Sequence, residues 1–119
     1  MQVMLITSRS TRRFIVPKGW LSKRKSDREA AGIEAKEEAG VIGRTLEPPI
    51  GHYRYWKRLS KHFIPVDVAV YLISVEEELD EWREPERRRA WLSPLDAATL
   101  IDEPGLASMV RSLAVPQEQ

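Results

Sequence analysis

Cysteine is absent from this sequence of 119 residues, which excludes disulfide bonds, thiolate zinc sites and cysteine nucleophiles. Histidine is scarce, and His52 and His62 each lack a second histidine at the spacing of a metal site. The sequence has no run of about 18 apolar residues and no basic segment leading into an apolar one at its start. We therefore expect no membrane-spanning helix and no secretory signal, which fits a reducing, cytoplasmic setting.

Charge is balanced overall but unevenly distributed. The formal net charge is +1, yet residues 1–28 contain eight basic residues and one acid, whereas residues 76–103 contain ten acids and four arginines. A basic entry segment favours an anionic ligand. Hydrophobic residues make up 42% of the chain, which is a globular balance, and the length predicts a single domain over residues 1–119.

The pattern of apolar residues predicts an α/β fold in the order strand, strand, helix, strands, helices. The clearest helix runs from Asp27 to Ala39, with Ser26 as a suitable N-cap and Gly40 as the stop. The run from Phe63 to Val75 predicts one long central strand, buried on much of both faces. The other predicted elements are strands at 3–6, 13–16, 50–56 and 88–92, an acidic loop at 76–86, and helices that begin at Pro94 and span 104–113.

Three glutamates lie close together on the predicted helix. Glu34 precedes Glu37 by three residues and Glu38 by four, so it shares a helix face with both. Like charges at this spacing repel by roughly a few tenths of a kcal/mol per pair, so stability alone does not favour the arrangement. Mg²⁺ prefers carboxylate and phosphate oxygens. The helix is therefore either a metal-binding face or a solvated acidic surface.

The loop before this helix favours the first interpretation. Gly19 follows a predicted strand, Lys25 comes after five further residues, and Ile33-Glu34-Ala35-Lys36-Glu37-Glu38-Ala39-Gly40-Val41 comes after seven more. This spacing resembles the box of the Nudix hydrolase family. Lys25 and Ile33 depart from the box, which usually has Glu and Arg there. The resemblance implies that those two residues pair as a brace in the family, and losing both need not leave a charge unpaired.

The resemblance covers most of the chain and implies a Nudix-type α/β/α sandwich with a mixed β-sheet. Residues 13–20, 51–53 and 82–91 look like the branch of the family that acts on diphosphoinositol polyphosphates and diadenosine polyphosphates. Family members usually have a further strand before the one at 3–6. Its absence here predicts either a start cut short or an open sheet edge, which a homodimer would cover.

The resemblance also implies the roles of individual residues. Glu34, Glu37 and Glu38 bind Mg²⁺, with Mn²⁺ as a substitute, and the backbone carbonyl of Lys18 is an added ligand. A carboxylate takes the proton of the attacking water, and Glu84, Glu86 and Glu37 itself are the candidates. The candidate phosphate contacts are the basic side chains of Arg9, Arg12, Lys18 and Lys57.

The aromatic and arginine-rich segments have more than one interpretation. Tyr53, Tyr55 and Trp56 could stack on a base, although aromatic residues in strands are more often part of the core. Arg87-Arg88-Arg89 resembles a nucleic-acid patch, but alternation along a strand sends Arg88 to the side opposite its neighbours. Nucleic acid is therefore not the expected partner, and a small phosphoanhydride is.

The sequence predicts a Mg²⁺-dependent hydrolase that cleaves a phosphoanhydride in a nucleotide-type substrate, first of all a dinucleoside polyphosphate. One alternative is hydrolysis of diphosphoinositol polyphosphates. Another is an inactive Nudix-fold module that binds nucleotide or RNA. The box reads only the diphosphate and the metal, so the substrate stays open at this point.

Overall fold

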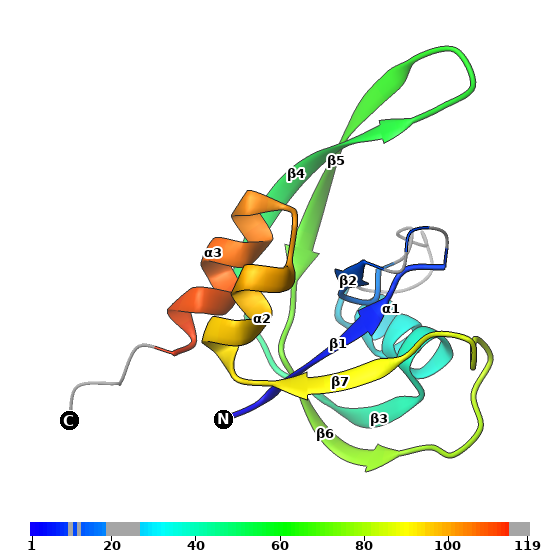
Figure 1. Cartoon of the computed structure of the whole chain (residues 1–119), viewed down its shortest axis with the longest axis vertical. Helices are drawn as coiled ribbons and strands as arrows, with labels where there is room; N and C mark the ends of the chain where they lie inside the picture. Colours follow the sequence, from blue (N-terminus) through cyan, green and yellow to red (C-terminus); the bar gives the residue numbers. More distant parts are fainter. Residues whose placement is uncertain (10, 12, 19–26, 115–119) are drawn as a thin grey trace.

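The computed structural model describes residues 1–9, 11, 13–18 and 27–114. Two strands precede the first helix, five strands follow it, and two further helices come last among the described elements (Figure 1). The elements are β1 (Val3–Thr7), β2 (Phe14–Ile15), α1 (Asp27–Glu34), the π-helix η1 (Ala35–Ala39), β3 (Val41–Thr45), β4 (Gly51–Arg58), β5 (Phe63–Val70), β6 (Ile73–Glu78), β7 (Arg89–Leu92), α2 (Pro94–Leu100) and α3 (Pro104–Ser112).

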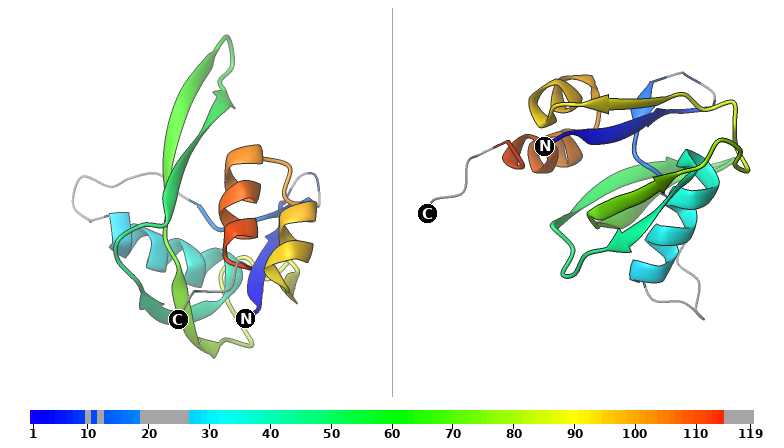
Figure 2. Two further views of the ribbon diagram at one scale, coloured as in Figure 1. Left: turned by 90° about the vertical axis from the view of Figure 1, so that its left-hand side faces the viewer. Right: turned by 90° about the horizontal axis from the view of Figure 1, so that it is seen from below.

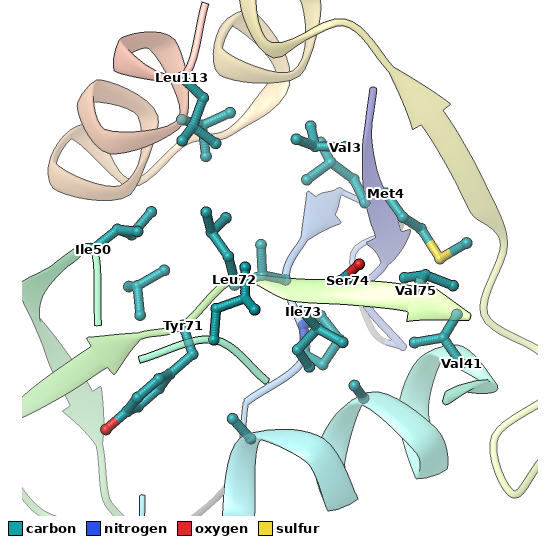
Figure 3. A pocket seen from close by; sticks show the side chains of 18 of the residues that line it. Val3, Met4, Val41, Ile50, Tyr71, Leu72, Ile73, Ser74, Val75 and Leu113 are labelled. Atoms are coloured by element: carbon teal, nitrogen blue, oxygen red, sulfur yellow. The ribbon is translucent and has the colours of Figure 1, made fainter. Parts of the chain in front are cut away.

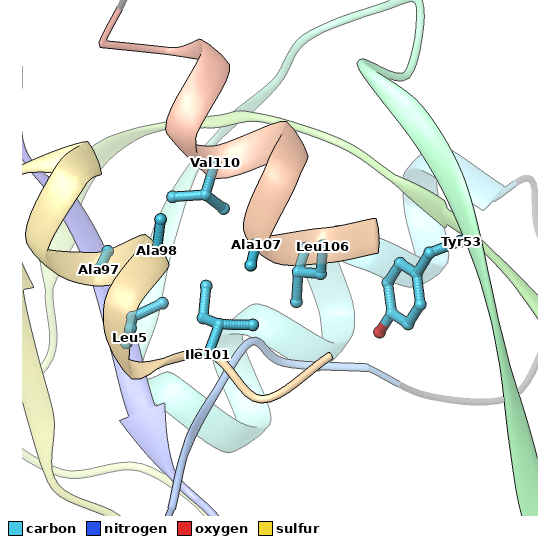
Figure 4. Close-up of a cluster of buried hydrophobic side chains, with 8 residues drawn as sticks. All are labelled: Leu5, Tyr53, Ala97, Ala98, Ile101, Leu106, Ala107 and Val110. Atoms are coloured by element: carbon cyan, nitrogen blue, oxygen red, sulfur yellow. The ribbon is translucent and has the colours of Figure 1, made fainter. Parts of the chain in front are cut away.

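Strand β1 is buried on both faces and joins the two layers of the core. Successive side chains of a strand point to opposite faces, and Leu5 and Ile6 are 1% and 0% exposed. Leu5 packs with α2 and α3 in the cluster shown in Figure 4. Ile6 packs against η1 and Val41 on the other side. Helices thus cover β1 from both directions, and the expected α/β/α sandwich is confirmed.

Helices α2 and α3 begin where their sequences contain capping residues. The N–H of Asp96 donates to the Ser93 hydroxyl at 3.2 Å, and Pro94 occupies the first turn, as predicted. In α3 the Glu103 carboxylate accepts from the Leu106 N–H at 2.7 Å. Leu106 and Val110 are buried on the inner face, as the helical spacing predicts. None of the described helices is long and apolar enough to cross a membrane.

The described strands form three small sheets, in the orders β2-β1-β7, β3-β6 and β4-β5, and every pair is antiparallel. The expected mixed sheet is not assembled from them, because no described strand lies between β1 and β6. The strand predicted at 13–16 is the short β2, and the one predicted at 88–92 is β7.

The single strand predicted from Phe63 to Val75 is wrong in two respects. The chain leaves the ladder at Tyr71 and Leu72, so β5 ends before β6 begins, and β6 includes Glu76–Glu78, which were expected in a loop. Strand β5 also alternates between exposed and half-buried side chains instead of being buried on both faces. Among the described strands it pairs with β4 alone, in a hairpin that extends beyond the rest of the molecule (Figures 1 and 2).

Strand β3 was not predicted. It is short, and Gly43 interrupts its apolar pattern. The structure explains this glycine, because a Cβ at Gly43 would collide with the Ser74 carbonyl of β6. The β3–β6 register shifts between Ile42 and Gly43, which is the irregularity that brings the two backbones so close.

An apolar cavity of about 470 Å³ separates β1 from β6 and the end of β5. Figure 3 shows Val3 and Met4 on one side and Leu72, Ser74 and Val75 on the other. On the side that carries β2, β1 pairs only through Ile6 and Thr7, so the backbone of Val3–Leu5 has no ladder partner there among the described residues. Strand edges beside an apolar cavity are favourable places for another chain to pair.

We therefore expect the chain to form a homodimer that covers part of these open edges. Isologous two-fold pairing is the commonest way to satisfy such an edge. Multi-angle light scattering at micromolar concentration should give about twice the monomer mass of 13.7 kDa. A monomer of ordinary solubility across that concentration range would contradict the expectation.

Candidate active site

Glu34 and Glu38 lie where an α-helix changes into a π-helix. Glu34 ends α1 and is followed by η1, and the N–H of Gly40 donates back to the carbonyls of Ala35 and Lys36. The predicted single helix from Asp27 to Ala39 is thus present, with a wider last turn. Single π-turns are rare in proteins, and those that do occur are frequently found at functional sites.

The carboxyl group of Glu38 is buried beside that of Glu34. Glu38 is 6% exposed. Burial raises the pKa of Glu38 to about 8, and a side-chain hydrogen bond with Glu34 and the charge of Glu34 act in the same direction. The charge of Arg87 and a hydrogen bond from the Lys18 backbone N–H lower it. Without a cation, these surroundings favour the protonated form of the Glu38 carboxyl group.

The donor set fits a hard divalent cation. Two convergent carboxylates offer only oxygen ligands, which suits Mg²⁺ or Mn²⁺. Glu37 does not converge with them, because its carboxylate lies 3.3 Å from Nη1 of Arg83. Within residues 1–9, 11, 13–18 and 27–114 no three acidic or histidine side chains are close enough to form a complete metal site. Glu34 and Glu38 would therefore hold the ion first, with phosphate or water supplying further ligands.

Glu84 reaches this region from the loop between β6 and β7. Its backbone N–H donates to the Glu37 carbonyl at 3.1 Å, which fixes the loop against η1. Its side chain accepts from Nε of Arg87 at 2.9 Å. The other predicted base, Glu86, is more exposed and lies 3.5 Å from Arg9. Glu84 is thus attached to η1, the element that carries Glu38, by a backbone hydrogen bond, whereas Glu86 lies beside the exposed Arg9.

The same loop closes the end of η1. Gly40 has a positive φ of 66°, and a Cβ there would lie 2.7 Å from the ring of Trp82. Arg89 stacks on that ring at 4.2 Å, and its Nη1 donates to the Leu79 carbonyl at 3.0 Å and, at longer distances, to the carbonyls of Ala39 and Gly40. A cation is favourable at a helix C-terminus. The predicted stop at Gly40 is confirmed, and Arg89 is the cap that sequence reasoning missed.

A cleft of about 540 Å³ opens beside Glu34, between α1 and the β4–β5 hairpin. Lys18, Tyr55 and Lys57 line it together with Glu34. The ammonium of Lys18 lies 4.6 Å above the Tyr55 ring. Desolvation lowers the pKa of Lys18, Glu38 opposes this, and the like charges of Lys57 and Arg87 lower it further. Two of the four predicted phosphate contacts are thus next to the carboxylates.

The remaining predicted residues fall elsewhere. Arg9 is exposed and lies 3.7 Å from Glu84, at the rim of the acidic loop. Tyr53 is in the core and Trp56 is 65% exposed, so only Tyr55 of the three aromatics faces the cleft. Arg88 is exposed while Arg87 and Arg89 are half-buried, as the alternation predicts. Four residues named in the predictions lie outside the described part of the chain, namely Arg12, Gly19, Lys25 and the N-cap candidate Ser26.

Known proteins are similar to this chain in sequence and in fold. No protein-family model matches it. It is 37% identical over 98 residues to Nudix hydrolase 4 of Arabidopsis thaliana, which covers 82% of this chain and 45% of that protein. It is 37% identical over 108 residues to Nudix hydrolase 16, mitochondrial, of the same plant, covering 87% and 59%. The chain spans about half the length of these curated relatives.

Solved structures show the same architecture. An Ap4A hydrolase of C. elegans in a binary complex matches with a TM-score of 0.67 and 18% identity, over 95% of this chain and 83% of that one. The E. coli ORF135 protein matches with a TM-score of 0.66 and 16% identity, over 98% and 86%. The fold is thus the α/β/α architecture of these proteins. With the similarity to the plant proteins, it places the chain in the Nudix hydrolase family.

The buried carboxyl pair predicts a pH-dependent stability in the metal-free protein. The folded-state pKa of Glu38, about 8, lies above the ordinary value of 4.5, so the native state binds the proton more tightly than the unfolded one. The contribution of Glu38 to the free energy of unfolding is then fully present below pH 4.5 and is lost as pH rises toward 8. Glu38→Gln removes this slope, and we expect it to be more stable than wild type at pH 8 by about 1–3 kcal/mol.

Urea unfolding in chelator at pH 5 and pH 8 measures this effect. Glu29→Gln, on the exposed first turn of the same helix, is the matched control and should keep the wild-type slope. An equal dependence of the unfolding free energy on pH in wild type and Glu38→Gln would contradict a raised pKa of the buried Glu38 carboxyl group.

Proposed function

We propose that this chain is a metal-dependent hydrolase that cleaves a phosphoanhydride in a nucleotide-type substrate, with a dinucleoside polyphosphate as the first candidate. The observation that carries the proposal is the buried Glu38 carboxyl group beside the half-buried Glu34, which lines a cleft with two lysines and one tyrosine. The fold neighbour from C. elegans is an Ap4A hydrolase, and this supports the substrate class.

The residues of the cleft divide the work of binding. Lys18 and Lys57 supply positive charge for the phosphate chain, because an ammonium is a point charge suited to phosphate oxygens. The face of Tyr55 offers a platform for a base once Lys18 turns toward phosphate. An aromatic platform favours a nucleotide over an inositol polyphosphate, which has no planar ring to stack.

The carboxylates have separate roles in the proposed reaction. Glu34 and Glu38 would hold Mg²⁺, and Glu37 would join them only after leaving Arg83. The bound ion would polarise a phosphoanhydride oxygen and lower the pKa of a water molecule. We expect Glu84 to accept a proton from the attacking water, and its position beside η1, where the loop backbone and Arg87 hold it, supports this role. Lys18 and Lys57 stabilise the charge that develops on the phosphate oxygens.

Glu38→Gln should lower kcat by about 10²-fold or more while the protein stays folded. The substitution removes a charged oxygen from the metal site and relieves repulsion in the metal-free state. Phosphate release in Mg²⁺ should be measured on a panel of a dinucleoside polyphosphate, a diphosphoinositol polyphosphate and a nucleoside triphosphate.

Glu29→Gln again serves as the control and should retain wild-type turnover. If Glu34→Gln and Glu38→Gln both keep full turnover, the helix is only an acidic surface. If wild type hydrolyses none of the panel but binds nucleotide, the inactive binding module is the better account.

Millimolar Mg²⁺ or Mn²⁺ should raise the melting temperature of the wild-type protein. A ligand that binds only the folded state stabilises it by mass action. The triple variant Glu34→Gln/Glu37→Gln/Glu38→Gln should show a much smaller rise in differential scanning fluorimetry. An identical rise in both proteins would point to nonspecific ion binding.

A further inference from the structure

Arg87 is the most enclosed charged side chain of the acidic loop, which in the structure is the segment between β6 and β7, and its side chain is 10% exposed. All three of its guanidinium nitrogens face oxygen atoms. Nε donates to the Glu84 carboxylate at 2.9 Å, and Nη1 donates to the Thr7 carbonyl at 3.1 Å. Nη2 lies 3.6 Å from the Glu38 carboxylate. A buried guanidinium is tolerated only when it is paired in this way.

These partners belong to three different parts of the fold. Glu38 lies in η1, Glu84 lies in the loop, and Thr7 ends β1 next to the fully buried Ile6. Backbone bonds fix the anchoring end, because the Thr7 N–H donates to the Arg88 carbonyl at 3.0 Å and the Arg88 N–H donates to the Thr7 hydroxyl at 2.9 Å. Arg87 therefore extends from a rigid strand end toward both carboxylates.

We propose that Arg87 is a positioning residue that sets the place of Glu84 relative to the Glu34–Glu38 pair, an assignment that rests on the proposed function. In this chain Arg87 takes over the bracing of the helix that Ile33, where the box has Arg, cannot provide. The brace comes from the loop before β7 instead of from the helix itself. The planar fork of an arginine is needed, because the donors of an ammonium all come from one nitrogen, whereas these contacts involve three separate guanidinium nitrogens.

The geometry separates this role from that of the neighbouring arginines. Arg83 is 73% exposed, and its ion pair within the described part of the chain is with the side chain of Glu37. The side chain of Arg88 is exposed and makes no hydrogen bond or ion pair with the described residues. Arg89 binds backbone carbonyls at the end of η1. Among the described arginines, Arg87 is thus the one that contacts both a helix carboxylate and Glu84.

The test compares Arg87→Met, which keeps much of the stem, with Arg88→Met as the matched control. We expect Arg87→Met to lower kcat by about 10- to 100-fold with KM within about threefold, and to weaken Mn²⁺ binding about tenfold. Mn²⁺ binding is measured without substrate by electron paramagnetic resonance of the free ion. The Arg88→Met control should stay within about twofold of wild type in each measurement.

Two further variants keep the proposal falsifiable if Arg87→Met folds poorly. Arg87→Lys retains the charge, and we expect it to fold and to recover only part of kcat and of Mn²⁺ affinity. In a Glu84→Gln background, Arg87→Met should lower kcat by much less than it does alone, because the two residues act as a unit. Full recovery by lysine, additive losses, or equal losses in Arg88→Met would overturn the proposal.

Failure of the proposed function has a different signature. If wild type hydrolyses nothing on the panel, the hydrolase assignment fails, and Mn²⁺ affinity alone then decides the role of Arg87. A tenfold loss of affinity in Arg87→Met but not in Arg88→Met would still support bracing of the carboxylates. Unchanged affinity would overturn it.

Discussion

The Glu38 carboxyl group is buried beside a second carboxyl group, and this electrostatic constraint shapes the surrounding structure. An isolated buried carboxylate is costly unless it is protonated, paired or bound to a cation. The Glu38 carboxyl group is surrounded by the Glu34 carboxyl group, the Lys18 N–H and the Arg87 guanidinium. These groups come from separate parts of the chain, so the Glu38 carboxyl group connects Lys18, the helix and the loop between β6 and β7.

The elements around this carboxyl pair are themselves held in place by packing and backbone hydrogen bonds. Strand β1 is buried on both faces through Leu5 and Ile6, and its end at Thr7 anchors the acidic loop. On the opposite side of η1, Val41 starts β3 directly after Gly40, so the helix end cannot shift without moving a strand. A site that binds a cation depends on such second contacts, because they fix the orientation of the ligands.

Sequence patterns predict the elements that have a local signal and miss those that depend on distant contacts. The helix, its stop at Gly40 and the helix start at Pro94 follow from composition and capping chemistry, which act within a few residues. The widening into η1 and the break at Tyr71 have no local signal, because they depend on packing against other strands. The strand at Val41–Thr45 was hidden by Gly43, whose reason is the Ser74 carbonyl on another strand.

The same division holds for the candidate site. The box spacing is enough to group Glu34, Glu37 and Glu38, but it does not predict that Glu37 turns to Arg83 while the other two converge. Arg87 was noticed only as part of a basic triplet. Its contact with Thr7 spans 80 positions in the chain, and no local pattern carries that information.

The acidic loop is held by two kinds of ion pair that respond differently to ionic strength. The pairs of Arg9 with Glu84 and of Arg83 with Glu37 involve arginines that are 63% and 73% exposed. Salt screens such pairs, since the Debye length falls from about 8 Å at physiological ionic strength to about 3 Å at 1 M. The enclosed contacts of Arg87 are screened much less. Added salt therefore loosens the rim of the loop first and leaves its inner attachment to the helix in place.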